Sequence, residues 1–266
     1  GQQPLISLPV DATHLPGRLK ALMRIGELAA NKLISQNRSG EIAIQVHDED
    51  PKVPCLRFDA PIDCPLDSLL IPDPYCLVSN GYADLIREFE EHNPLPSWKE
   101  RISKAFWRGS TTGIPKLELN NLYNLPRYRL CNFSNSHQIL LDARFTAIVQ
   151  TTSKYEYKHL MQRIVEENIF APRSSPWHGA LHRWLIDIDG NVNSWGLLWK
   201  LLSGSCVLRV SSKHKQWYHH LLEPMKHFIP ICEDLSDLES KLIWCHNNDT
   251  ICEKIATDGK SLAKKI

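Results

Sequence analysis

The stretch LHRWLIDIDGNVNSWGLLWKLLSGSCVLRV, residues 181–210, decides the fold of this chain. An apolar run at 184–186 leads into turn-forming residues at 187–191, among which Gly190 and Asn191 tolerate positive φ. Apolar residues then recur at helical spacing over 195–202, and 206–210 has the composition of a strand. This order predicts a βαβ unit whose helix N-terminus offers free N–H groups to a phosphate.

Strands and helices alternate along the rest of the chain. Periodicity predicts helices over 17–35, 82–92, 155–167 and 214–225, and two more near the C-terminus. It predicts strands over 41–46, 102–107, 126–130 and 228–231, and the prolines between 51 and 74 indicate loop and edge structure. Such alternation favours an α/β fold with two Rossmann-like halves facing a cleft, residues 1–150 and 151–266.

The composition narrows the class of partner. The chain has 266 residues, of which 31 are Lys or Arg and 30 are Asp or Glu, so its formal net charge is +1. This balance provides no global field to recruit nucleic acid. The apolar stretches are shorter than the roughly 20 residues of a membrane span, so we expect at most peripheral membrane contact.

The eight cysteines show no Cys-x-x-Cys pair and no zinc-finger spacing. An even number permits four disulfides, but Cys131 and Cys206 lie in apolar segments where free buried cysteine is common, which favours reduced thiols. The last residues lack a retention signal of the Lys-Asp-Glu-Leu type.

Three motifs in order carry a resemblance to a known family. They are GYADLIRE at 81–88, FWRGSTTG at 106–113 and IDGNVNSW…LLSGSCVL within 188–208. Together they resemble glycosyltransferase family 90, which includes CAP10-like capsule and lipopolysaccharide sugar transferases and the protein O-glucosyltransferases of the secretory pathway. The resemblance implies a GT-B-like architecture, a UDP-sugar donor and no obligatory metal or other cofactor.

The resemblance places donor-binding residues in two segments. The first follows a predicted strand: Arg108, Gly109, Ser110, Thr111 and Thr112 offer a guanidinium and three hydroxyl groups to phosphate oxygens. From spacing alone the same residues also suit a surface loop with a salt bridge. Arg127 and Arg129 share one face of the predicted strand 126–130, so either one reaches the cleft or both lie on a solvated face.

The second donor-binding segment lies in the predicted βαβ unit of residues 181–210. It contains Asp189, Gly190, Ser194 and Trp195. Protein O-glucosyltransferases carry an arginine where this chain has Gly196, and Lys200 either replaces that positive charge or is an ordinary helix-surface lysine.

The sequence Asp187-Ile188-Asp189 also spells the Asp-x-Asp of metal-dependent GT-A enzymes. Since the family works without an obligatory metal, the preferred role of Asp189 is a turn residue or a contact to a hydroxyl or ribose.

The family's catalytic aspartate falls on Asp84 in the first motif, although Tyr82 and Ala83 depart from the usual Arg-Trp before it. A carboxylate there would take the proton of an acceptor hydroxyl as its oxygen attacks the anomeric carbon. Without the resemblance, Asp84 reads as an acidic residue that complements a helix dipole.

The expected function is therefore an inverting glycosyltransferase that moves a hexose or pentose from a UDP-sugar to a hydroxyl of a lipopolysaccharide or capsule-type glycan. We expect it in the cytoplasm or peripheral to the inner membrane. Two alternatives stay open, which are a protein O-glucosyl- or xylosyltransferase of the ER or Golgi lumen, and a non-catalytic nucleotide-sugar-binding protein.

Overall fold

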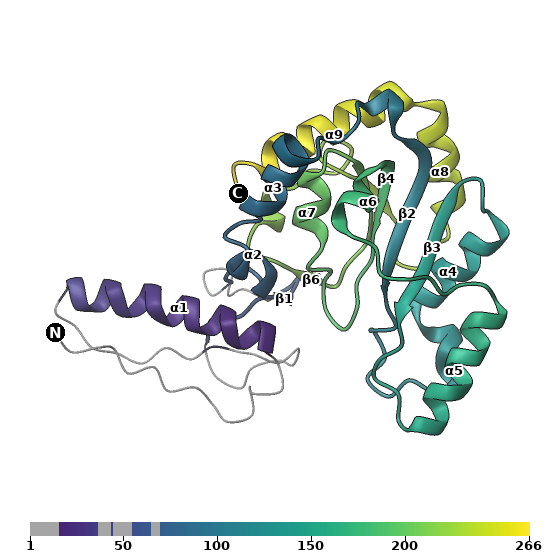
Figure 1. Ribbon diagram of the computed structural model, residues 1–266, viewed down its shortest axis with the longest axis horizontal. Coiled ribbons are helices and arrows are strands. Elements are labelled where there is room, and N and C mark those ends of the chain that lie inside the picture. The colour runs from purple at the N-terminus through teal and green to yellow at the C-terminus, as the bar shows by residue number, and fades with distance from the viewer. Residues whose placement is uncertain (1–15, 37–43, 45–54, 65–69) are drawn as a thin grey trace. The chain divides into compact units, whose positions relative to one another are not determined.

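The computed structural model describes residues 16–36, 44, 55–64 and 70–266 (Figure 1). They form two compact units. The first contains the described residues up to Leu85 and His214–His220, and the second contains Ile86–Lys213 and Leu221–Ile266. Helix α3 (Ala83–Arg87) begins in the first unit and ends in the second, and a π-helical turn, Glu88–His92, continues it. Together they match the predicted helix 82–92.

The first unit is built from short elements and one long helix. Helix α1 (Pro16–Ser35) matches the predicted helix 17–35 and contacts α2 (Pro74–Val78). Asp73 caps α2, since its carboxylate accepts the backbone N–H groups of Tyr75 and Cys76. Strand β1 (Ala60–Pro61) pairs antiparallel with β6 (His214–Lys215). The predicted strand 41–46 lies outside the described residues, except that residue 44 forms a bridge with residue 56.

The second unit is an α/β structure around a five-stranded parallel sheet, which confirms the predicted class. Its strands are β2 (Ile102–Ser110), β3 (Leu141–Ala147), β4 (His182–Asp187), β5 (Cys206–Val210) and β7 (Ile229–Ile231). Their spatial order is β3-β2-β4-β5-β7, and every neighbouring pair is parallel. The predicted βαβ unit is present as β4, α7 (Leu197–Leu202) and β5.

Helices cover both faces of this sheet. On one face Trp107, Ile186 and Leu208 share a buried core with residues of α4 (Pro126–Ser136), α8 (Leu238–Asn247) and α9 (Asp249–Ala263). On the other face Phe106 lies beside Gly179 of α6 (Pro176–Ala180), which also faces Trp199 of α7. Strands buried on both faces explain the nearly continuous apolar runs in β4 and β5.

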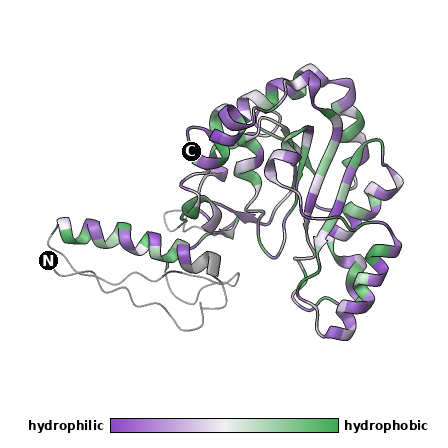
Figure 2. Cartoon of the chain, in the orientation of Figure 1, coloured by the Kyte–Doolittle hydropathy of each residue, from purple (hydrophilic) through white to green (hydrophobic). Residues whose placement is uncertain are grey.

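The remaining helices follow the sequence closely. Helix α5 (Lys154–Glu166) matches the predicted helix 155–167, begins at a Ser153 cap and alternates polar with apolar residues along its length (Figure 2). Short 3₁₀ turns cover Trp98–Glu100, Leu119–Asn124 and His219–Leu221. Among the described residues, no helix is both long and apolar enough to cross a membrane. All eight cysteines are free thiols, six of them buried.

Three predictions were wrong. Residues 126–130 begin helix α4 instead of forming a strand, because Pro126 supplies the fixed φ that suits the first helical position. Residues 214–225 contain β6 and a 3₁₀ turn where we predicted a helix. The boundary at residue 150 falls inside one sheet, because β2 and β3 precede it while β4 pairs directly with β2.

Candidate functional site

The order of the strands defines where this sheet can bind a ligand. The chain enters the sheet at β2, adds β3 on one side, and then adds β4, β5 and β7 on the other. The direction therefore reverses between β2 and β4. Open α/β sheets bind ligands in the crevice outside the carboxyl ends of the strands at such a reversal. The segments that leave these ends, residues 110–113 after β2 and 188–194 after β4, are called the switch-point loops below.

A single arginine from α4 ties the two switch-point loops together. The Arg127 guanidinium donates to the backbone oxygens of Ser110 (3.1 Å), Ile188 (3.1 Å) and Asp189 (2.7 Å), and also to the Thr112 hydroxyl. All these acceptors are neutral, and the guanidinium lies over the Trp107 ring. Burial lowers the Arg127 pKa to about 10, although the negative charges of Asp189 and Asp187 partly oppose this shift. The guanidinium therefore stays charged at neutral pH.

Two further contacts fix how closely the loops approach each other. A Cβ atom on Gly190 would lie 2.6 Å from the Thr112 hydroxyl oxygen and 3.1 Å from an Arg127 nitrogen, so only glycine fits. The backbone N–H of Gly113 donates to the side-chain oxygen of Asn191 at 3.0 Å. Gly190 is therefore required for packing the loops, whether or not it also touches a ligand.

Asp189 is held within the second switch-point loop. Its carboxylate accepts the backbone N–H of Ser194 at 3.0 Å. Burial, with a smaller contribution from the neighbouring charge of Asp187, raises the Asp189 pKa to about 6, although hydrogen bonds from Ser212 and Ser194 and the charge of Arg209 lower it. The Asp189 carboxylate thus stabilises the turn within this loop, and its raised pKa brings its titration closer to neutral pH.

A buried ion pair lies at the end of β4. The Lys200 ammonium donates to the Asp187 carboxylate at 2.6 Å, and the two side chains are only 10% and 4% exposed. A Cβ atom on Gly196 would lie 3.4 Å from the same ammonium nitrogen, so Lys200 reaches the start of α7 beside Gly196. Lys200 is therefore not a surface lysine. The helix itself is shorter than predicted, with six residues, and we assign no phosphate contact to its N-terminus.

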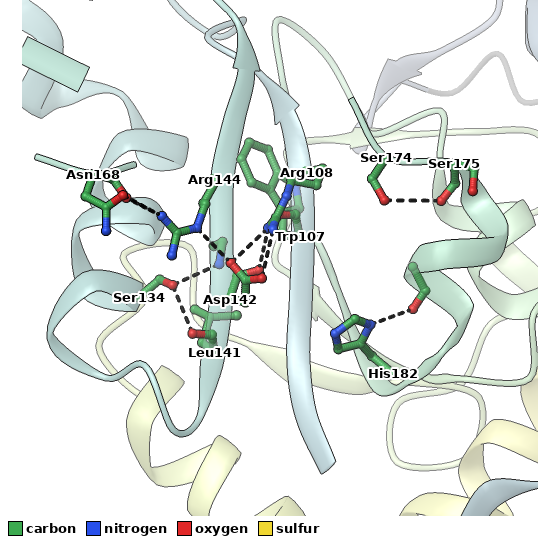
Figure 3. Close-up of polar contacts among 12 residues, drawn as sticks. Trp107, Arg108, Ser134, Leu141, Asp142, Arg144, Asn168, Ser174, Ser175 and His182 are labelled. Carbon is green, nitrogen blue, oxygen red and sulfur yellow. Dashed lines mark hydrogen bonds and ion pairs between the residues drawn. The ribbon is translucent and has the colours of Figure 1, made fainter. Parts of the chain in front are cut away.

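Arg108 faces away from the loops and pairs with a carboxylate. It donates twice to Asp142, at 3.0 and 2.8 Å, and Arg144 donates to the same carboxylate at 3.1 Å (Figure 3). Burial raises the Asp142 pKa, but the hydrogen bonds and charges of Arg108 and Arg144 outweigh it and hold the pKa below its ordinary value. The salt-bridge alternative for Arg108 is the one the structure shows.

Two more of the predicted donor residues are engaged in packing, and a third lies on α4. The Thr111 hydroxyl exchanges hydrogen bonds with the backbone of Val149, and Thr111 is fully buried. A Cβ atom on Gly109 would collide with the Trp107 ring at 2.5 Å. Arg129 lies on α4, two residues after Arg127, and its Nε atom is buried without a hydrogen-bond partner among the described residues. Ser110, Thr112, Asp189, Gly190 and Ser194 remain together at the switch-point loops, with Trp195 next in the chain.

Asp84 belongs to the first unit, in the first turn of α3, and is exposed. The three residues Asn80, Gly81 and Tyr82 before this helix all have φ between 50° and 70°. For Asn80 and especially Tyr82 this conformation is strained. Ser79 holds it in place, since its hydroxyl accepts the backbone N–H of Tyr82 at 3.0 Å. Strain of this kind concentrates at functional sites, and here it directly precedes the predicted catalytic aspartate.

The Asp-x-Asp pair does not form a shared cation site in the described residues. The Asp187 carboxylate is bound to Lys200, whereas the Asp189 carboxylate is bound to a backbone N–H. Within the same part of the chain, no three or more His, Cys, Asp or Glu side chains are grouped so that they could hold a metal ion.

The family profile of Glycosyl transferase family 90 matches residues 80–265, which include α3, the switch-point loops and the whole parallel sheet. The chain belongs to glycosyltransferase family 90. The profile covers most of the chain and spans all three motifs that carried the resemblance.

Relatives of this family member come from viruses and from vertebrates. It is 33% identical over 180 residues to Uncharacterized protein 027R of frog virus 3, covering 62% of this chain and 18% of that protein. It is 28% identical over 172 residues to Protein O-glucosyltransferase 2 of Danio rerio, covering 64% of this chain and 30% of the relative. The chain thus spans less than a third of the length of these two relatives.

A solved structure with a similar fold is HepE of Anabaena in complex with UDP and glucose. It is 12% identical, covers 70% of this chain and 50% of HepE, and has a TM-score of 0.43.

We predict that Arg127→Lys destabilises the family 90 chain by about 2–4 kcal/mol, because an ammonium cannot bridge four acceptors and leaves buried carbonyl groups without donors. Denaturant unfolding measures this loss. Arg129→Lys, on the same helix, is the matched control and should change the free energy of unfolding by less than about 1 kcal/mol. Equal effects of the two substitutions would contradict the bridging role of Arg127.

We also predict that Asp189→Asn changes how stability depends on pH. Because the folded-state pKa of Asp189 is raised to about 6, its contribution to stability is complete below about pH 4 and is lost as pH rises through 6. Relative to wild type, the Asn variant should therefore gain up to about 3 kcal/mol between pH 4 and pH 7. Denaturation at several pH values measures the difference. Asp258→Asn should change in the opposite direction, because Lys254 lowers the Asp258 pKa.

Proposed function

We propose that this chain is the nucleotide-sugar-binding part of an inverting glycosyltransferase, and that the UDP-sugar diphosphate binds at the switch-point loops. The observation that carries the proposal is the Arg127 bridge, which places a guanidinium that is hydrogen-bonded only to neutral oxygens against both loops. A fixed cation in a partly buried site stabilises the charge that develops on a departing diphosphate. The hydroxyl groups of Ser110, Thr112 and Ser194 supply donors of the kind that phosphate oxygens accept.

Lys200 is the second cation of the proposed donor site. An ammonium carries three N–H donors, and the Asp187 carboxylate takes one of them in the described residues. Its nitrogen lies beside Gly196, where the protein O-glucosyltransferases of the family carry an arginine. Because Gly196 has no side chain, the Lys200 ammonium fits beside it. In this chain Lys200, one turn later in the helix, therefore supplies the positive charge that the arginine supplies in those relatives. This arrangement supports the proposal that the chain binds a donor. The alternative is that glycine in place of arginine at position 196 abolishes donor binding.

Asp84 is the proposed general base. Its carboxylate takes the proton of the acceptor hydroxyl, the hydroxyl oxygen bonds to the anomeric carbon, and the bond from that carbon to the diphosphate oxygen breaks. UDP leaves with the electron pair of that bond. Attack from the face opposite the diphosphate inverts the configuration of the sugar. The exposure of Asp84 at the start of α3 suits a base that must meet an incoming acceptor.

For the acceptor, we propose a glycan of the lipopolysaccharide or capsule type, modified in the cytoplasm or at the inner membrane. The alternative is a protein hydroxyl in the ER or Golgi lumen, which is favoured by the similarity to Protein O-glucosyltransferase 2 of Danio rerio. Measuring sugar transfer from UDP-glucose and from UDP-xylose to glycan acceptors and to folded-protein acceptors distinguishes the two acceptor classes. Release of UDP from any donor excludes the non-catalytic alternative, and we expect it to continue in EDTA.

We predict that the double substitution Asp187→Asn and Lys200→Met weakens UDP binding about tenfold, which corresponds to about 1.4 kcal/mol. The two changes are combined because Lys200→Met alone would leave a buried unpaired carboxylate and destabilise the fold. Calorimetric titration with UDP measures the effect. Lys254→Met removes an exposed lysine of α9 and should bind UDP as wild type does. Unchanged affinity in the double variant assigns the ion pair a purely structural role.

Asp84→Asn should abolish sugar transfer while UDP binds with unchanged affinity, because only the proton acceptor is lost. Glu88→Gln, one turn later on the same side of the helical segment, serves as the matched control and should transfer sugar at the wild-type rate. Initial rates with saturating donor and acceptor measure the effect. Retained turnover in the Asn variant would remove Asp84 from the mechanism.

A further inference from the structure

A pocket lies at the end of the same sheet opposite the switch-point loops. Its volume is about 310 Å³, and it is formed by the 3₁₀ turn before β2, the turn before β5 and the last turns of α9. The residues that line it include Arg101, Gly204, Glu253, Thr257, Lys260 and Lys264. Arg101 directly precedes β2 and Gly204 precedes β5, so this α9 pocket lies at the amino ends of the strands. The switch-point loops follow the carboxyl ends, which makes the two sites distinct.

The floor of the α9 pocket contains a guanidinium that contacts only neutral groups. Arg101 donates to the backbone oxygens of Pro96 and Ser203 and to the Ser205 hydroxyl, at 3.0 to 3.2 Å. In the part of the chain that the structure describes, no carboxylate pairs with it. Burial lowers the Arg101 pKa to about 10, so the group remains a cation. Three of its five N–H donors are engaged, and two are left for a ligand.

Two lysines add to this charge. Lys260 and Lys264 both contact one carboxylate oxygen of Glu90, at 3.1 and 2.7 Å. The three side chains are 30–44% exposed, and exposed ion pairs contribute only about 0–1 kcal/mol. An anionic ligand can therefore compete for both ammonium groups. Counting Arg101, Lys260 and Lys264 against Glu90 and Glu253, the pocket keeps a net positive charge.

Gly204 lies against the side chains of both Arg101 and Lys260. A Cβ atom on Gly204 would lie 3.4 Å from the Lys260 side chain and 3.7 Å from an Arg101 nitrogen. Gly204 also has a φ of +71°, a conformation that favours glycine. The turn before β5 thus brings a backbone without a side chain close to the Arg101 guanidinium and to the aliphatic part of the Lys260 side chain.

We propose that the α9 pocket binds a small sugar phosphate, with the phosphate group between Arg101, Lys260 and Lys264. A phosphate suits this site because its several oxygens accept donors from different directions, whereas a single carboxylate offers two. The Glu253 carboxylate and the hydroxyl groups of Thr257 and Ser261 line the same pocket and match the hydroxyl groups of a sugar. Ligand binding in the α9 pocket uses no residue of the switch-point loops, so this proposal does not depend on the proposed transferase activity.

The test is calorimetric titration of the whole chain, saturated with UDP, with glucose 1-phosphate and separately with inorganic phosphate. We expect glucose 1-phosphate to bind, and Lys260→Gln combined with Lys264→Gln to weaken it at least about tenfold. Lys254→Gln removes a lysine of the same helix that pairs with Asp258 outside the pocket, and it should leave the affinity unchanged. No binding to wild type, or equal affinities in wild type and the double variant, overturns the proposal.

Two further arms identify the ligand and the place. Glu253→Gln should weaken glucose 1-phosphate but not inorganic phosphate, and equal weakening of both would overturn the sugar part of the proposal. The Asp187→Asn, Lys200→Met variant should bind glucose 1-phosphate as wild type does, whatever it does to UDP. Loss of glucose 1-phosphate binding in that variant would place the ligand at the donor site and overturn the α9 pocket.

Discussion

The hydrogen bonds of Arg127 are the constraint on which the rest of the second unit depends. Adjacent strands β2 and β4 fix where two loops begin, but the loops leave the sheet with backbone carbonyl groups that need donors. One planar guanidinium satisfies three of these carbonyls and a hydroxyl, and lysine could not. Gly190 is required because any side chain there would displace Thr112 or Arg127.

Charge is distributed in the unit so that few cations remain uncompensated. Arg108 is neutralised by Asp142, and Lys200 contacts Asp187, whereas Arg127 contacts only neutral oxygens. A buried cation without a contacting carboxylate is costly unless its hydrogen bonds are complete. Arg127 engages four of its five N–H donors at the carboxyl ends of the strands, and Arg101 engages three at the amino ends. These two guanidinium groups are the cations on which the proposed anion sites depend.

The parts of this structure that local sequence determines were predicted well. The apolar runs of β4 and β5, the turn at 187–191 and the spacing of α7 are all encoded within thirty consecutive residues. Partners distant in sequence were not predictable. The residues next to Arg108 in the sequence do not indicate that its partner is Asp142. The alternation of Arg127 and Arg129 is typical of a strand, and only Pro126 at the first helical position indicates a helix. The predicted domain boundary at residue 150 was wrong for the same reason, because the pairing between β2 and β4 cannot be recognised from neighbouring residues in the sequence.

Asp189 links the proposed donor site to protonation. Its carboxylate is already poorly solvated and lies near the charge of Asp187, so its pKa is raised to about 6 before any ligand is present. A diphosphate placed against the same loop adds negative charge and disfavours the ionised form further. Binding of the donor and uptake of a proton by Asp189 therefore favour each other, as linkage requires. Protonated, Asp189 could donate a hydrogen bond to a phosphate oxygen; ionised, it can only accept one, from a hydroxyl such as that of a ribose.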